Sequence, residues 1–332
     1  MTGSITSELA GMLTDPLMQR ALVAALLVGV SAPVVGTYLV QRKLSLLGDG
    51  IGHVALTGVA LGWLVGSAMG LVPNDALAIP GAVVAAVIGS VAIELVRERG
   101  RTSGDLALAL LFYGGIAGGV LLIGVAGGSA GSLMQYLFGS ISSVTSSDLV
   151  LTVVLSAVIL LVGLGLRAAL FSVSHDEEFA RASGLPVRTL NIAVAVVAAL
   201  TVTVSMRVVG LLLVSALMIV PVAVAQLVTR SFRRTMLVAS VVGVVVCVAG
   251  LSITYWKLLS PGATIVVLAI GTYLVVALLS PLWVRRRPRV ARDPHPDIPD
   301  DVDLPEARPV LAGALGPTGA DRPTTGGDTC SA

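Results

Sequence analysis

The apolar residues of this 332-residue chain come in long blocks, and no other feature constrains the fold as strongly. A helix needs about 20 mostly apolar residues to cross a hydrocarbon core roughly 30 Å thick. Charged residues make up 12% of the chain, well below the share of about 25% in a typical soluble domain. Candidate spans lie near residues 17–40, 50–70, 76–97, 105–126, 149–167, 190–205, 208–228, 236–255 and 263–284.

These blocks predict an all-α polytopic membrane protein with about eight or nine transmembrane helices. Nine is the preferred count, although eight or ten also fit, because only Met206 and Arg207 separate the sixth and seventh blocks. Glycines recur every four residues in the second block, which lets two helix backbones approach closely in lipid. The glycines of this stripe are Gly58, Gly62, Gly66 and Gly70.

The distribution of Lys and Arg predicts the orientation, since cytoplasmic loops carry an excess of both. With nine spans, all basic clusters fall on one side, which places the N-terminus outside and the C-terminal tail in the cytoplasm. The expected location is the bacterial inner (plasma) membrane. Glu94 lies among arginines near the inner end of its span and is expected to pair there. The basic clusters lie at 42–43, 97–101, 181–188, 230–234 and 285–289.

Both termini differ in character from the membrane region, residues 17–284. Residues 1–16 have no basic start and carry two acidic residues, so this N-terminal segment is not expected to be a cleaved signal. Residues 285–332 are rich in Pro, Gly and Asp and lack aromatic residues, which predicts a disordered cytoplasmic tail. His295 in that tail is more simply a solvated side chain than a metal ligand.

Asp49 and His53 are the strongest candidate site residues. Ionisable groups inside a bilayer are costly and are functional candidates by default. In a helix that begins near Ser45, a spacing of four places both side chains on one face. Oxygen and nitrogen donors of this kind suit Zn, Mn or Fe better than a cuprous ion. Two alternatives remain, namely a buried Asp–His hydrogen bond and a helix-start Asp with an unrelated His.

The segment SHDEEFARASGLPVRTLN, residues 174–191, predicts a short cytoplasmic helix between two spans. Ser174 is the expected N-cap, with Glu177 three residues later. Gly184 is expected to end the helix, and Pro186 follows. A short helix with a small-residue body suits docking into a groove on a soluble partner better than a plain loop does.

Three stretches together resemble the permease subunits of metal-uptake ABC transporters, which serve zinc, manganese and in some members iron. They are the stretch around Asp49 and His53, the cytoplasmic segment, and VVGLLLVSALMIVPVAVAQL at 208–227. The resemblance covers about residues 15–284. It implies a type II ABC importer-like permease that forms a homodimer and works with two cytoplasmic ABC ATPase subunits and an extracytoplasmic metal-binding protein.

The resemblance also implies roles for particular residues. Asp49 and His53 would line the path of a divalent metal, which is the transported substrate and not a bound cofactor. The segment at about 174–190 would couple the chain to the ATPase, through Glu178, Ala180 and Gly184. One departure is Ser140, where members often carry an acidic residue after LFG.

Two rival functions predict other patterns. An ion-coupled secondary transporter would need no docking helix and would place more carboxylates at mid-membrane. An intramembrane metalloenzyme needs an H-E-x-x-H helix or three ligands on one zinc, whereas the three histidines here are scattered. The chain has no phosphate loop of the G-x-x-x-x-G-K-[ST] type, so ATP chemistry must come from a partner and the chain is not itself an enzyme. Its expected surroundings are membrane lipid and protein partners, not nucleic acid.

Overall fold

The computed structural model describes residues 11–12, 14–71, 76–99, 104–126, 130–139, 145–257 and 259–285. The predicted tail, most of the N-terminal segment and Ser140 lie outside these residues. Within the described part the chain is helical and has no strand, which confirms the fold class. Nine of its helices are long and apolar enough to cross a membrane, in agreement with the preferred count.

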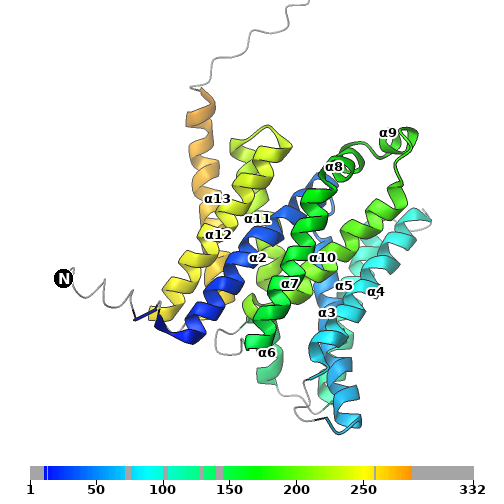
Figure 1. Ribbon diagram of the computed structural model, residues 1–332, viewed down its shortest axis with the longest axis vertical. Helices are drawn as coiled ribbons and strands as arrows, with labels where there is room; N and C mark the ends of the chain where they lie inside the picture. The colour runs from blue at the N-terminus through cyan, green and yellow to red at the C-terminus, as the bar shows by residue number, and fades with distance from the viewer. Residues whose placement is uncertain are drawn as a thin grey trace, which may run out of the picture. The chain divides into compact units, whose positions relative to one another are not determined.

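The helices lie side by side along the bundle (Figure 1). The nine spanning helices are α2 (Pro16–Gln41), α3 (Leu47–Ala68), α4 (Ala78–Glu98), α5 (Gly104–Val125), α7 (Ser146–Gly165), α10 (Val187–Val209), α11 (Leu211–Val228), α12 (Phe232–Trp256) and α13 (Pro261–Arg285). Three shorter helices complete the order: α6 (Ala130–Phe138), α8 (Arg167–His175) and α9 (Glu177–Ala182). Helix α2 packs against α7 and α12 and is among the most deeply buried, whereas α13 is the most exposed span.

Glycines set the spacing of α3 from its two main neighbours, α4 and α5. The glycine stripe works as predicted at Gly58 and Gly62, where a side chain would collide with the α4 backbone at Gly81 and Leu77. Gly70 instead adopts a left-handed φ of 67° beyond the end of α3. In the stripe, Gly58 and Gly62 therefore form a packing surface, and Gly70 lies where the helix has ended.

The boundary between the sixth and seventh spans lies at Gly210, not at Met206 and Arg207. Gly210 alone separates α10 from α11 and has a φ of 88° and a ψ of 153°, a conformation that is essentially restricted to glycine and costs other residues about 1–3 kcal/mol. A Cβ there would also collide with the backbone of Phe138 and Gly139. Only glycine allows both this backbone conformation and this close contact. Because the turn needs no polar residue, it leaves no break in the apolar pattern of the sequence.

Gly115 of α5 packs directly on the backbone of α3 at His53. A Cβ on Gly115 would lie 2.6 Å from the carbonyl carbon of His53, whereas one on the neighbouring Gly114 would meet nothing within 4 Å. We therefore expect Gly115→Ala to separate the two helices and to cost about 1–3 kcal/mol of stability. Gly114→Ala is the matched control. Thermal unfolding in detergent should show a lower midpoint for Gly115→Ala alone, and equal midpoints would contradict this packing.

Candidate metal site and coupling helix

Asp49 and His53 lie on one face in the first two turns of α3, as the spacing predicts. Asp49 Oδ1 is 3.8 Å from His53 Nε2, which is too long for a hydrogen bond. Asp49 Oδ1 instead accepts a hydrogen bond of 3.2 Å from the hydroxyl of Ser215 in α11. The structure therefore has no Asp–His hydrogen bond, although the two groups lie within ion-pair distance. Asp49 lies in the first turn of α3, as the alternative of a helix-start Asp also expects.

The surroundings of the two side chains differ. His53 is 7% exposed, and its ring meets the ring of Phe112 edge-on with centroids 4.6 Å apart. Its Nδ1 atom is buried without a hydrogen-bond partner. The Asp49 side chain is 25% exposed and lines a cavity of about 310 Å³ between the start of α3 and α5. The imidazole is thus held within the bundle, while the carboxylate faces open space.

The donor set is incomplete within the described part of the chain. No group of three or more His, Cys, Asp or Glu residues there could hold a metal ion. The other residues that line the cavity are apolar or aromatic: Leu46, Leu108, Ala109, Phe112 and Tyr113. Asp49 and His53 can supply one oxygen and one nitrogen, so a metal at this place needs further ligands from water or from another chain.

Sequence reasoning did not find Ser215, Phe112 or the cavity. Ser215 stands in an apolar span, 166 residues from Asp49, and nothing in the pattern of that span singles it out. Phe112 likewise reads as an ordinary apolar residue of α5. Only the packing of α5 and α11 against α3 brings these side chains to the site.

The short helix α9 exists, but it starts two residues later than predicted. Ser174 belongs to the last turn of α8 and is buried, so it cannot act as the N-cap. Asp176 takes that role in an extended conformation, and its carboxylate accepts a hydrogen bond of 2.9 Å from the Phe179 amide. Helix α9 is therefore a separate helix of six residues.

The end of α9 is a Schellman motif, in which two hydrogen bonds close the last turn. Leu185 N donates to Ala180 O and Gly184 N donates to Arg181 O, both at 3.1 Å. Gly184 adopts a φ of 79°, which confirms the predicted glycine stop. Ala180 is fully buried, whereas Glu178 and Phe179 are exposed. Phe179 is 64% exposed, so α9 presents an aromatic ring on its outer face.

Ion pairs join the ends of three helices near α9, at what we call the basic end of the bundle. Glu94 of α4 pairs with Arg97 at 2.9 Å and with Arg42, just after α2, at 3.7 Å. Burial lowers the pKa of Arg42, and the Glu94 carboxylate opposes that shift. Glu98 of α4 pairs with Arg188 of α10 at 3.1 Å. The expected pairing of Glu94 is confirmed, and these ends lie on the same side of the bundle.

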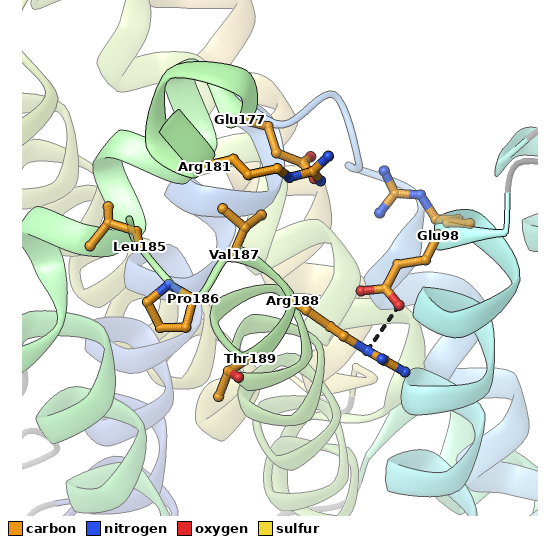
Figure 2. Close-up of a pocket in the computed structure, with 9 residues that line it drawn as sticks. Glu98, Glu177, Arg181, Leu185, Pro186, Val187, Arg188 and Thr189 are labelled. Carbon is orange, nitrogen blue, oxygen red and sulfur yellow. Dashed lines mark hydrogen bonds and ion pairs between the residues drawn. The ribbon is translucent and has the colours of Figure 1, made fainter. Parts of the chain in front are cut away.

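A cleft of about 610 Å³ separates α9 from the ends of α4 and α10 (Figure 2). Glu177 and Arg181 of α9, which pair at 3.2 Å, lie on one side of it, and the Glu98–Arg188 pair lies on the other. Helix α9 packs mainly against α8. Open space therefore lies between α9 and the end of α4.

Comparison with known proteins decides the family. The sequence matches the ABC 3 transport family over residues 14–280. The chain belongs to that family. It is similar to the manganese transport system membrane protein MntC of Listeria monocytogenes, with 30% identity over 274 residues that cover 82% of this chain and 94% of MntC. It is also similar to the chelated iron transport system membrane protein YfeD of Yersinia pestis, with 31% identity over 87% of this chain and 95% of YfeD.

A solved structure agrees with the family match. PsaBC from Streptococcus pneumoniae, in complex with Fab, matches with a TM-score of 0.72 and 31% identity over 82% of this chain and 95% of that chain. The family match and the PsaBC structure confirm the resemblance to metal-uptake ABC permeases that the sequence shows. The chain is a multi-pass membrane subunit of an ABC transporter. ATP hydrolysis in such a transporter belongs to a separate subunit, which confirms that the chain is not itself an enzyme.

Proposed function

We propose that this chain is the permease subunit of an ABC importer that moves a divalent transition metal into the cytoplasm. The observation that carries the proposal is the placing of Asp49 and His53 on one face of α3, with the carboxylate open to a cavity, in a chain of the ABC 3 transport family. An ionisable pair of this kind inside a membrane helix is costly and is a functional candidate for that reason.

Manganese(II) and iron(II) are the first candidates for the metal. One carboxylate oxygen and one imidazole nitrogen suit Mn, Fe and Zn alike. MntC is named for manganese and YfeD for chelated iron, which favours those two metals. Zinc has the same donor preferences and belongs in the same test.

The permease works as a homodimer in this proposal. Asp49 is partly exposed next to α5, whose residues Leu106, Leu110 and Tyr113 are also exposed. A carboxylate facing lipid would be costly, and two protein donors do not complete a metal site. A second copy packed on the face formed by α3 and α5 would solve both problems, because it would exclude lipid and bring a second Asp49 and His53.

Transport would then proceed as follows. A loaded extracytoplasmic metal-binding protein docks on the outer loops, and the metal enters the path between the two copies. Asp49 and His53 hold it transiently, with Asp49 oriented by the Ser215 hydroxyl. An ATPase subunit docks on α9 at the basic end, at the exposed residues Glu178 and Gly184, and the ATPase cycle moves the helices. Ala180 is fully buried, so it holds α9 against the bundle and does not contact the ATPase.

The test is metal uptake by proteoliposomes that contain the chain together with its ATPase subunit and the metal-binding protein. We expect ATP-dependent uptake of manganese or iron(II), none of magnesium, and none with an ATPase that cannot hydrolyse ATP. Uptake that needs no ATPase but follows a proton or sodium gradient would show a secondary transporter and would contradict the proposal.

A further inference from the structure

The ion pair between Arg42 and Glu94 is the most buried one in the described part of the chain, and the metal site makes no use of it. The Arg42 and Glu94 side chains are only 7% and 3% exposed. Glu94 has a second partner in Arg97, so this carboxylate stays paired even if Arg42 moves. A buried ion pair is weak grounds for stability, because the cost of removing both charges from water offsets much of their attraction. Its position in the fold points to another role.

Arg42 belongs to the short connection that leads to the metal site. Helix α2 ends in a Schellman motif, in which Leu44 N donates to Leu39 O at 2.8 Å and Lys43 N donates to Val40 O at 3.1 Å. Lys43 takes the left-handed position of that motif with a φ of 57°, although it is not a glycine. Helix α3 begins at Leu47, so Asp49 lies in its first turn. The connection is short and tightly wound. A displacement of Arg42 is therefore expected to move Asp49 as well.

The Arg42–Glu94 pair is joined through Arg97 to the cleft beside the coupling helix. Arg97 donates a hydrogen bond of 2.9 Å to Glu94. Arg97 also lines the cleft, together with Glu177 and Arg181 of α9. Glu177 is exposed there (Figure 2). Arg42 and Arg97 therefore share the Glu94 carboxylate, and Arg97 lies at the cleft that α9 lines.

We propose that Arg42 and Glu94 are positioning residues that transmit movement of α9 to the metal site, with Glu94 holding Arg42 and Arg42 setting the start of α3. This inference rests on the proposed function. In it, a shift of α9 changes the position of the Glu177 charge relative to Arg97 at the cleft. Arg97 and Arg42 share the Glu94 carboxylate, so a change at Arg97 changes how Glu94 holds Arg42 and the α2–α3 connection. Asp49 then moves relative to Ser215 and His53, which changes the affinity of the site for the metal.

The experiment compares metal uptake per ATP hydrolysed in the complete transporter. The variants are Glu94→Gln and the double variant Arg42→Gln/Glu94→Gln. Glu94→Gln leaves the Arg42 charge buried without its partner, so it is expected to lower the unfolding midpoint as well. The double variant removes both charges and should recover stability. We expect both to hydrolyse ATP while uptake per ATP falls at least tenfold, and Glu94→Asp, which keeps the charge, to restore most of the coupling.

The matched control is the double variant Arg188→Gln/Glu98→Gln, which removes a more exposed pair at 67% and 29% exposure on the far side of the same cleft. It should keep uptake per ATP within twofold of the wild type. A stable Arg42→Gln/Glu94→Gln variant with wild-type uptake per ATP would overturn this inference alone and reduce the pair to a structural role. A wild-type transporter that imports no metal would overturn the proposed function, and this inference with it.

Discussion

His53→Ala should reduce metal uptake at least about 100-fold without loss of the protein from the membrane. Removing a partner that only orients a metal ligand typically costs 10–100-fold in metal affinity, so removing a ligand itself should cost at least as much. His53 supplies the nitrogen donor of the proposed site, and its buried Nδ1 has no hydrogen-bond partner within the described part of the chain. The measurement is the initial rate of manganese uptake at fixed protein abundance.

Changes at Asp49 and Ser215 should form a graded series with His53→Ala. Asp49→Asn keeps the shape and can still accept the Ser215 hydrogen bond, but it loses the charge, so uptake should again approach background. Ser215→Ala removes only the orienting hydroxyl and should cost about tenfold. Ser240→Ala is the control, since that hydroxyl bonds to backbone oxygens of Val30 and Met236 away from the site. Full uptake by both His53→Ala and Asp49→Asn would refute the site.

The spans could be predicted from sequence because hydrocarbon thickness imposes a length that local composition reveals. The break at Gly210 could not. The charged Arg207, next to Met206, is the interruption that the sequence shows between the sixth and seventh blocks. The chain instead turns at a single glycine four residues after Met206. Its left-handed φ and its contact with the backbone after α6 are properties of the packed structure, which an apolar pattern does not record.

The start of α9 shows the same limit at smaller scale. Ser174 and Asp176 are both good N-cap residues, and capping chemistry alone does not choose between them. The end of α8 makes the choice, because Ser174 lies inside α8 whereas Asp176 has the extended conformation of an N-cap. The candidate metal site shows the same limit: the i,i+4 spacing revealed Asp49 and His53, but the partners from α5 and α11 depend on how those helices pack.

Substitutions at Gly184 should uncouple ATP hydrolysis from metal uptake in an order set by side-chain size. Gly184 has a φ of 79°, and a Cβ there would meet nothing within 4 Å inside the chain. The chain itself thus has room for a side chain, and only the backbone conformation favours glycine. If α9 docks into a groove on the ATPase, the side chain at position 184 must also be small enough to fit that groove.

Alanine and asparagine separate these two demands. Alanine is small but costs about 1–2 kcal/mol in the left-handed conformation, which asparagine tolerates better. We expect Gly184→Ala to keep most of its uptake per ATP and Gly184→Asn to lose at least tenfold, together with weaker co-purification of the ATPase. Helix termination alone predicts the reverse order. Gly184→Asn with normal coupling, beside an impaired Gly184→Ala, would therefore show that Gly184 shapes the end of α9 and makes no contact with the ATPase.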